Sequence, residues 1–409
     1  MKYLLIIGDG MADDPLAELG GKTPLQFART PAMDAIASAG ELGGVLTIPE
    51  GMQAGSDTAI LSIFGFDPRK YYTGRAPLEA AATGIKLSPG DVAYRCNMVT
   101  FEDGEMPFEE KKIISHSAGS IDGEESASLV SQLFEAPAFK EAARAAGMSV
   151  YPAFSFRHIA VQKAHDIAGL ELTPPHDHLG DALGKHLPRG GDNAAVLENL
   201  MRLAHAELDG HPINVKRRSE GKLPANGVWF WAEGTVAELP SFASKYGKTG
   251  GIISAVPLCQ GIGALIGLDM VFVEGATGEL NTNYEGKVEA ALETLKKRDF
   301  ATVHIEAPDE CSHDGDLDGK VQAIEWIDSR VVAPLIKQLL EAGEDYRVLV
   351  ISDHRTLMST RGHDGGPVPY VIFDSRRDRK TGLSFCEADA ALGALIGEGK
   401  ELMRLLFEG

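Results

Sequence analysis

Acidic and imidazole side chains follow three apolar runs of this chain, each with the length and composition of a buried strand. They are Asp9 after residues 3–8, Asp309 and His313 after residues 300–305, and Asp353 and His354 after residues 347–352. In an open parallel sheet, the carboxyl ends of the strands share one edge, where ligands gather. Groups crowded there would repel one another or lack partners unless cations bind them. His363, in a glycine-rich loop, completes six ligands, which is enough for two metal ions sharing a site.

A candidate nucleophile, Ser56, lies in the sequence Gly-Ser-Asp-Thr at residues 55–58, just before an apolar-periodic run. This pattern predicts the start of a helix, and Ser56 or Asp57 could simply be its N-cap residue. A serine at a helix N-terminus also faces unpaired N–H groups that favour a phosphate, and a nearby metal can lower the pKa of its hydroxyl. The two interpretations are compatible.

Each of these features alone has an ordinary structural explanation. An aspartate after a strand is commonly a helix cap, an Asp-His pair is commonly a polar contact, and D-x-x-x-H fits two positions on one helix face. Three strand ends that supply such groups, together with Ser56, favour a shared metal site with a serine nucleophile.

The elements that position these residues alternate along the chain. Further short apolar runs are found at residues 227–231, 251–256 and 270–273, and helical patterns at residues 285–297 and 318–342. This alternation predicts an α/β fold with a mainly parallel sheet flanked by helices.

The middle of the chain has a different pattern. Residues 92–102 and 149–163 alternate apolar and polar side chains, a helical stretch at 123–146 separates them, and residues 173–192 are rich in turn formers. We therefore expect a discontinuous main domain, residues 1–83 and 183–409, with a smaller α+β domain inserted at residues 84–182.

Composition narrows the class of protein. The 409 residues carry a formal net charge of -20, which argues against a nucleic-acid binder because phosphate backbones require a basic face. The four scattered cysteines fit reduced thiols. The N-terminal apolar run is too short for a signal peptide, and no stretch reaches the ~18 apolar residues of a membrane span. We expect a cytoplasmic protein that does not contact membranes, and a homo-oligomer stays open.

The motifs resemble a known family. Ile-Ile-Gly-Asp-Gly-Met at residues 6–11, Gly-Ser-Asp-Thr at 55–58, Ala-Pro-Asp-Glu-x-x-His-Asp-Gly at 307–315 and Ser-Asp-His at 352–354, with the later His363, are similar to the alkaline phosphatase superfamily. Within it, the chain resembles the cofactor-independent phosphoglycerate mutases of the archaeal type. The resemblance covers essentially the whole length, including residues 211–214 and 221–226.

The resemblance implies an alkaline-phosphatase-like fold with two divalent metal ions. Asp309, His313 and His363 would hold one ion, and Asp9, Ser56, Asp353 and His354 would hold the other. Ser56 would take the phosphoryl group from 3-phosphoglycerate and return it to the 2-hydroxyl, while the inserted domain closes over the site. Mixed carboxylate and imidazole ligands make Mn²⁺ the expected metal, with Zn²⁺, Co²⁺ or Mg²⁺ as alternatives.

A small phosphorylated substrate also needs cations and hydrogen-bond donors from the protein. The candidates are Arg75, Arg95, Asn97, His116, Arg157, His158 and Arg217. A surface ion pair is the ordinary alternative for each arginine.

One stretch departs from the archaeal pattern. Residues 115–120, Ser-His-Ser-Ala-Gly-Ser, contain no arginine where archaeal mutases usually carry several. In this respect the chain looks closer to a bacterial subgroup proposed to act as a homoserine kinase. Three alternatives to a mutase therefore stay open: a homoserine-kinase-like phosphotransferase, a phosphomonoesterase, and a non-catalytic metal-binding relic, against which the intact ligand set and Ser56 argue.

Overall fold

The computed structural model describes residues 1–409, except the side chain of Phe154, and the chain folds into two compact units. Unit 1 comprises Met1–Tyr72 and Glu238–Gly409, and unit 2 comprises Thr73–Ala237. The inserted unit is therefore longer than the expected residues 84–182, chiefly because residues 183–237 pack within it.

Unit 1 contains a sheet of eight strands in the order β15-β2-β14-β11-β1-β10-β8-β9. The strands are β1 (Lys2–Gly8), β2 (Glu41–Val45), β8 (Gly250–Ile253), β9 (Asp269–Val271), β10 (Phe300–Ile305), β11 (Tyr346–Ser352), β14 (Val368–Asp374) and β15 (Ala394–Ile396). Only β14 runs against its neighbours, so the sheet is mainly parallel. A separate hairpin pairs β12 (Arg355–Leu357) with β13 (Gly362–Asp364).

Helices lie on both faces of this sheet. They are α1 (Pro24–Phe27), α2 (Pro31–Ala39), α3 (Ser56–Ile63), α4 (Pro68–Tyr71), α10 (Phe242–Tyr246), α11 (Pro257–Leu265), α12 (Tyr284–Lys297), α13 (Ala307–Asp314), α14 (Leu317–Trp326), α15 (Ala333–Glu341), α16 (Glu387–Ala390) and α17 (Leu402–Glu408), with shorter turns at η1 (Ala17–Leu19) and η6 (Gly399–Glu401) and a π-helical segment η5 (Ile327–Val332) between α14 and α15.

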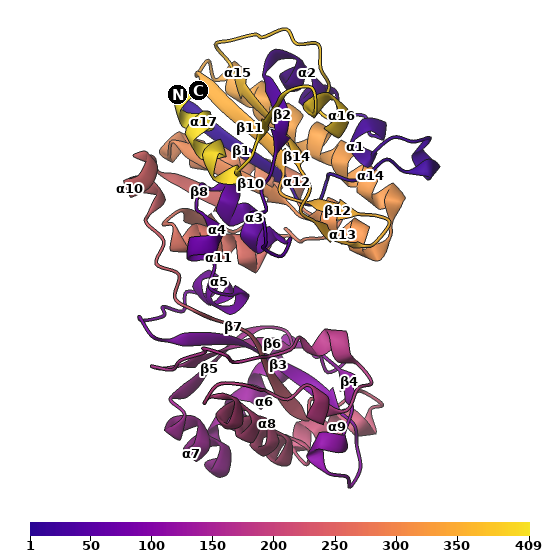
Figure 1. The fold of residues 1–409 in the computed structure, drawn as a ribbon, viewed down its shortest axis with the longest axis vertical. Coiled ribbons are helices and arrows are strands. Elements are labelled where there is room, and N and C mark those ends of the chain that lie inside the picture. The colour runs from indigo at the N-terminus through magenta and orange to yellow at the C-terminus, as the bar shows by residue number, and fades with distance from the viewer. The chain divides into compact units, whose positions relative to one another are not determined.

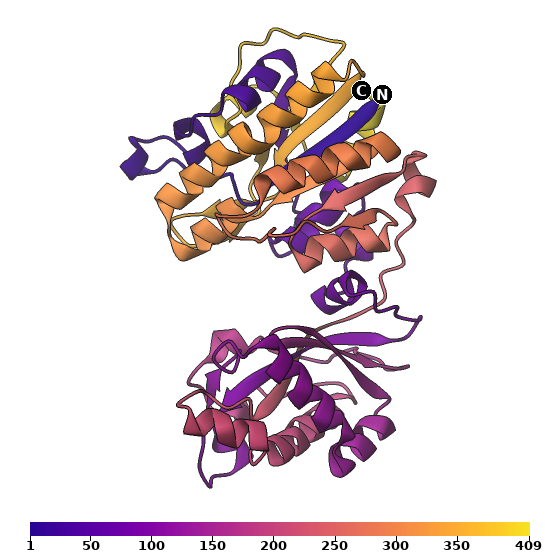
Figure 2. The same ribbon diagram turned by 180° about the vertical axis from the view of Figure 1, so that it is seen from behind.

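Consecutive strand residues point to opposite faces of the sheet, so neighbouring residues of one strand pack against different sets of helices. Leu4 and Ile6 of β1 pack in one core with residues of α2, α12, α14 and α15, and Figure 2 shows α12, α14 and α15 crossing that face. On the other side, the Phe300 ring lies 5.8 Å from Phe407 of α17 and 6.4 Å from Phe64 after α3. The predicted α/β class, with a mainly parallel sheet between helices, is confirmed.

Unit 2 is built on an antiparallel sheet, coloured violet to magenta in Figure 1. Its strands are β3 (Val92–Phe101), β4 (Ile113–Ser115), β5 (Met148–Phe154), β6 (Arg157–Gln162) and β7 (Gly227–Thr235). Strand β3 pairs with β4, β6 and β7, and β5 pairs with β6. The apolar run at 227–231 was expected in the parallel sheet of the main domain, but it forms most of β7 and pairs antiparallel with β3.

The helices of unit 2 divide between the two faces of its sheet. They are α5 (Arg75–Ala82), α6 (Gly123–Glu135), α7 (Pro137–Ala145), α8 (Ala194–Leu208) and α9 (Pro212–Ser219), with short turns η2 (Phe108–Glu110), η3 (Pro175–His178) and η4 (Leu183–Lys185). Tyr94 and Cys96 of β3 face a core formed with α6, α7 and α8. Ala93, the residue before Tyr94, packs against Ala76 and Ala80 of α5, on the opposite face.

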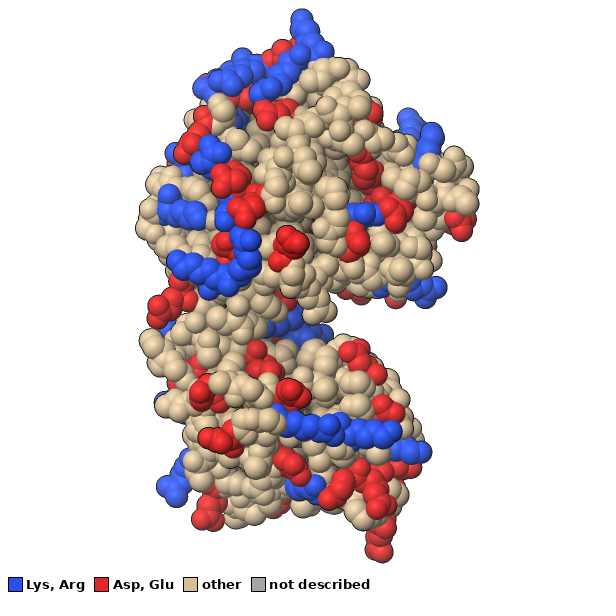
Figure 3. All heavy atoms as spheres, viewed as in Figure 1, with Lys and Arg blue, Asp and Glu red and all other residues tan. Residues whose placement is uncertain are grey.

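The surface carries both signs of charge. On the face in Figure 3, basic and acidic side chains are interspersed over each unit. Within the described part of the chain, every helix is too short or too polar to span a bilayer.

Candidate active site

The central strands of unit 1 bring Asp9 and Asp353 to the same edge of the sheet. Gly8, at the end of β1, pairs with Ile305 of β10 on one side and with Ser352 of β11 on the other. Asp9 and Asp353, which directly follow Gly8 and Ser352, therefore lie side by side at the carboxyl edge of the sheet. The backbone N–H of Gly10 donates to Asp353 Oδ1 at 3.1 Å, which holds the two segments together.

His304, near the end of β10, is a site residue that the sequence interpretation missed. Its Nε2 lies 2.9 Å from Asp9 Oδ2, and its Nδ1 lies 3.1 Å from Ser254 Oγ. Burial, with a contribution from Lys287, lowers the pKa of His304 to about 3. The neutral ring therefore donates from Nε2 to Asp9 and accepts at Nδ1, which orients the carboxylate. The one available signal was a histidine inside an otherwise apolar strand.

Asp309, His313 and His363 converge as the first group of donors. Asp309 and His313 lie one turn apart on α13, and His363 comes from β13. Asp309 Oδ2 is 3.2 Å from His313 Nε2, and Asp309 Oδ1 is 3.4 Å from His363 Nε2. Burial alone would raise the pKa of Asp309, but hydrogen bonds from His313 and His363 hold that pKa well below its usual value. The same bond to Asp309 raises the pKa of His313 to about 9.

The two imidazoles of this group face each other, with their Nε2 atoms 3.0 Å apart. His313 Nδ1 is 2.9 Å from the carbonyl oxygen of Arg361, which accepts from the ring and leaves Nε2 as the site-facing nitrogen. Tetrahedral ligands at about 2.0–2.1 Å from a metal lie roughly 3.3 Å apart. The spacing of these nitrogens and of Asp309 therefore suits one bound cation.

Ser56 is the first residue of α3 and lies beside a second group of donors, Asp9, Asp353 and His354. Its Oγ is 3.1 Å from His354 Nε2 and 3.5 Å from Asp9 Oδ2. The N-cap residue is Gly55, so the interpretation of Ser56 or Asp57 as the cap is wrong. The Ser56 side chain is directed at the donor group and not at the helix backbone.

Thr356 links the two donor groups, and the sequence interpretation also missed it. Its hydroxyl donates to Asp309 Oδ1 at 2.5 Å and lies 3.1 Å from His354 Nδ1. Gly10, at φ +62°, passes so close that a Cβ atom there would lie 2.5 Å from the Thr356 hydroxyl and 2.8 Å from Asp309 Oδ1. Glycine is therefore required at this position both by conformation and by space.

The second group of donors contains buried carboxylate oxygens that divalent cations would satisfy. Asp9 Oδ1 and Asp353 Oδ2 are buried without a hydrogen-bond partner among the described residues. His354 Nε2 lies 3.4 Å from each of them. Burial, together with the charges of Asp353 and Asp309, raises the pKa of Asp9 well above its usual value. Buried carboxylate oxygens without partners are costly, and divalent cations would satisfy them.

All seven predicted substrate-binding residues lie in unit 2, and five of them form one group: Arg75, Arg95, Asn97, His116 and Arg157. Arg95 and Asn97 lie on the β3 face that α5 covers. The Arg95 guanidinium lies 4.6 Å from the Trp231 ring centroid, and Trp231 Nε1 donates to Asn97 Oδ1 at 3.0 Å. Asn97 Nδ2 donates to the carbonyl oxygen of His116 at 3.1 Å. We call this set, with Trp231, the arginine face.

Glu79 is the carboxylate shared by the three arginines of this face. Arg95 Nε donates to Glu79 Oε2 at 2.9 Å, and Arg75 Nε lies 3.6 Å from Glu79 Oε1. Burial opposes ionisation of Glu79, but the charges of Arg95, Arg75 and Arg157 lower its pKa. Three guanidinium groups thus act on one carboxylate, which favours binding of a further anion.

His116 stands at the border of the arginine face. Its ring lies 5.7 Å from that of Phe156 and 5.9 Å from that of His176. Burial and the charge of Arg157 lower the pKa of His116, so the ring is neutral at pH 7. His116 therefore offers a hydrogen bond, not a full charge, in place of the missing arginines.

The remaining two substrate candidates, His158 and Arg217, lie in other parts of unit 2. His158 points to the side of the sheet that α6 covers, where its Nε2 is 2.8 Å from Ser126 Oγ, and burial lowers its pKa to about 4. Arg217 is buried and donates to Glu125 Oε2 at 2.6 Å and to two backbone carbonyls. The structure does not bring either residue to the arginine face.

The sequence of this chain was compared with family models and with the sequences of known proteins. A family model of 2,3-bisphosphoglycerate-independent phosphoglycerate mutase matches residues 37–214. A relative of that name from Methanothrix thermoacetophila is 46% identical over 410 residues, covering 100% of both chains. This chain belongs to that family.

Solved structures agree with the family assignment. A protein from Pyrococcus horikoshii is 31% identical with a TM-score of 0.81, over 100% of this chain and 96% of the other. The cofactor-independent phosphoglycerate mutase from Thermoplasma acidophilum is 27% identical with a TM-score of 0.65, over 100% of this chain and 99% of the other. The fold and family expected from the motifs are confirmed.

Proposed function

We propose that this chain interconverts 3-phosphoglycerate and 2-phosphoglycerate in the cytoplasm without 2,3-bisphosphoglycerate, by transfer through a phosphoserine at Ser56. The observation that carries the proposal is the position of Ser56 Oγ, 3.1 Å from His354 Nε2 at the edge of a buried carboxylate group with unpaired oxygens. Membership of the family names the reaction that this arrangement supports.

The proposal assigns two divalent ions to the two donor groups. Asp309, His313 and His363 would hold one ion, and Asp9, Ser56, Asp353 and His354 the other. The convergence of Asp309, His313 and His363 supports the first set. Asp9 and His354 also converge, with Asp309 beside them, which puts Asp309 between the two sets. When bound, the ions would lower the pKa of the Ser56 hydroxyl and stabilise charge on the transferring phosphoryl oxygens. Mn²⁺ is the expected metal, because mixed imidazole and carboxylate ligands disfavour Mg²⁺ alone.

The proposed reaction has two symmetrical steps, one that forms the phosphoserine and one that consumes it. Ser56 Oγ first attacks the phosphorus of 3-phosphoglycerate, the bond to the 3-oxygen breaks, and the serine proton ends on that oxygen. The 2-hydroxyl of the bound glycerate then attacks the phosphoserine, and its proton returns to Ser56. No water is consumed. His304 orients Asp9 throughout, and Thr356 orients Asp309 and His354.

The arginine face would bind the anionic groups of the substrate. Arg75, Arg95 and Arg157 supply charge, and Asn97 and His116 supply hydrogen bonds. Binding of a carboxylate or phosphate there offsets the charge that Glu79 alone does not balance. We propose structural roles for His158 and Arg217, because each is buried and already hydrogen-bonded.

An assay coupled to enolase tests the reaction. The purified chain with Mn²⁺ should produce 2-phosphoglycerate from 3-phosphoglycerate without added 2,3-bisphosphoglycerate, and chelation should abolish the signal. Absence of product with each of Mn²⁺, Zn²⁺, Co²⁺ and Mg²⁺ would refute the mutase proposal.

A homoserine-kinase-like activity is the second candidate, because residues 115–120 contain no arginine and His116 is neutral. This activity needs a phosphoryl donor, and the sequence contains no P-loop. Formation of phosphohomoserine in a donor screen, without phosphoglycerate turnover, would favour this candidate. Rapid hydrolysis of an aryl phosphate would instead indicate a phosphomonoesterase.

A further inference from the structure

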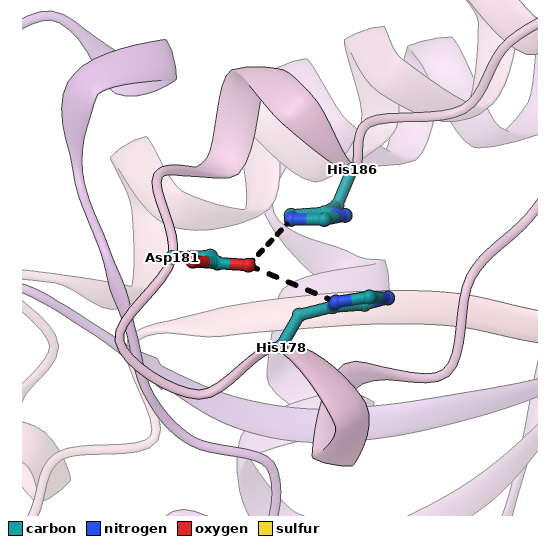
Figure 4. A group of neighbouring side chains, drawn as sticks. All are labelled: His178, Asp181 and His186. Carbon is teal, nitrogen blue, oxygen red and sulfur yellow. Dashed lines mark hydrogen bonds and ion pairs between the residues drawn. The ribbon is translucent and has the colours of Figure 1, made fainter.

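One loop of unit 2 carries three metal-ligating side chains that the proposed reaction does not use. They are His178, at the end of η3, Asp181, and His186, directly after η4. Figure 4 shows both imidazoles with a ring nitrogen directed at the Asp181 carboxylate. We propose that these residues form a further divalent-cation site, of the Zn²⁺ class, separate from the two ions of unit 1.

The donor atoms are spaced as the ligands of one ion would be. Asp181 Oδ2 lies 3.0 Å from His186 Nε2 and 3.8 Å from His178 Nδ1. These distances bracket the roughly 3.3 Å that separates tetrahedral ligands at about 2.0–2.1 Å from zinc. The two rings are stacked, with centroids 3.8 Å apart and planes 15° apart. Because the rings are nearly parallel, their in-plane nitrogen lone pairs do not meet at one point, so one ring would rotate about its side-chain bonds when a shared cation binds.

The backbone that carries the donors is anchored, so the arrangement does not depend on the side chains alone. Gly180 N–H donates to the carbonyl oxygen of Ile113 at 2.8 Å, and Ile113 N–H donates to that of Asp181 at 3.1 Å. The N–H of Leu183, a fully buried residue, donates to the carbonyl oxygen of Lys111 at 2.8 Å. The loop backbone is therefore tied to the β4 region on both sides of Asp181, so the positions from which the three side chains extend are fixed before any ion binds.

The chemistry of the donors selects the ion. Two imidazoles and one carboxylate suit Zn²⁺, Co²⁺ or Ni²⁺ better than Ca²⁺ or Mg²⁺, which prefer oxygen ligands. The side chains of His178 and Asp181 are 26% and 46% exposed, so solvent can reach the remaining coordination position. The result is a three-ligand site completed by water, with an exchangeable ion.

An ion at this site would also hold η3 in place. His176, two residues before His178 in the same short helix, places its ring 5.2 Å from Trp231 and 5.9 Å from His116. Binding to His178 would therefore restrain the segment that brings His176 to the arginine face. The site itself stands independently of the reaction proposed above.

The test is zinc binding by the full chain after chelation and desalting. Zinc per chain is measured after equilibration with a small molar excess of ZnCl₂ and removal of the free metal. Wild type should hold one equivalent more than His186→Ala and than Asp181→Asn. His165→Ala, which removes a half-buried histidine of the same unit outside the cluster, is the matched control and should bind as wild type does.

Amide hydrogen exchange provides a second measurement, which can be made on wild type and does not require variants of the proposed site to fold. The variant His363→Ala separates the result from metal binding in unit 1. In wild type, zinc should slow exchange in residues 175–186, and the slowing should persist in His363→Ala, where an active-site ligand is missing. Equal zinc content in wild type and both site variants, or exchange in this segment that zinc leaves unchanged, would overturn the proposal. Loss of mutase activity alone would leave both measurements as predicted.

Discussion

The donor groups of unit 1 and the arginine face of unit 2 are both polar clusters beside a sheet, yet their charges are opposite. In unit 1, Asp9, Asp309 and Asp353 are buried together, and oxygens of Asp9 and Asp353 have no partner among the described residues. In unit 2, three arginines act on the single carboxylate of Glu79. One cluster has carboxylates in excess and the other has cations in excess.

This difference indicates what each cluster binds. Carboxylates buried without partners are stable only when cations neutralise them, whereas guanidinium groups near one shared carboxylate favour an added anion. The division matches a reaction in which metal ions act on the transferred phosphoryl group and arginines hold the rest of an anionic substrate. Four substitutions test this contrast, from the largest expected effect to the smallest.

Ser56→Ala should have the largest effect, because it removes the proposed nucleophile itself. We expect mutase activity to fall by about 10⁴-fold or more, and phosphoserine trapped by acid quench to disappear. Ser62→Ala, in the same helix, is the matched control and should retain both. Wild-type turnover by Ser56→Ala would remove the serine from the mechanism.

His363→Ala should cost metal and activity together. His363 Nε2 lies 3.4 Å from Asp309 Oδ1, and the variant should lose one metal equivalent by elemental analysis. We expect activity to fall by more than the roughly 100-fold that loss of an outer-shell partner costs. Thr360→Ala, at an exposed position in the turn that precedes β13, should behave as wild type. Full metal content in His363→Ala would exclude it from the ligand set.

Arg157→Ala should weaken substrate binding and leave the transfer chemistry nearly intact. We expect KM to rise roughly 10- to 150-fold, which corresponds to the 1.5–3 kcal/mol of a charge-assisted hydrogen bond, with kcat changed only a few-fold. The control is Arg144→Ala, an exposed arginine of α7. If kcat fell while KM stayed constant, the arginine face would have no role in substrate binding.

His158→Gln tests the opposite face of the same sheet and should change stability more than catalysis. The pKa of His158 is about 4 in the folded chain, against 6.5 when unfolded. Below pH 6.5 the unfolded state takes up a proton that the folded state does not, so stability falls as the pH falls towards 4. From pH 7 to pH 5 this group should cost about 2 kcal/mol.

Chemical denaturation of wild type and His158→Gln at pH 7 and pH 5 measures that component. Wild type should lose about 2 kcal/mol more than the variant over this interval, because glutamine does not titrate. Parallel losses in the two proteins would show that His158 is not a buried neutral histidine.

The elements around the unit 1 site were largely predictable from local pattern. Residues 300–305 form β10 at those bounds, and D-x-x-x-H places Asp309 and His313 one turn apart on α13. These features depend on neighbours a few residues away, because strand alternation and helix periodicity are local properties.

The sequence interpretation was weaker where partners are distant in the chain. The run at 227–231 has the composition of a buried strand in either sheet, and its pairing with β3 depends on residues about 130 positions earlier. His304 and Thr356 were missed because their roles arise from contacts with Asp9 and Asp309, far away in the sequence. Local composition carries no signal of such contacts.

For this protein, the sequence by itself determined which candidate ligands exist and at which strand ends they stand, because residue type and local periodicity suffice for that. Tertiary structure alone decided which atoms meet: that Ser56 Oγ reaches His354, that oxygens of Asp9 and Asp353 lack partners, and that His158 turns away from the arginine face. The physical reason is that strand register and burial, which join segments hundreds of residues apart, set both the distances and the local charge balance.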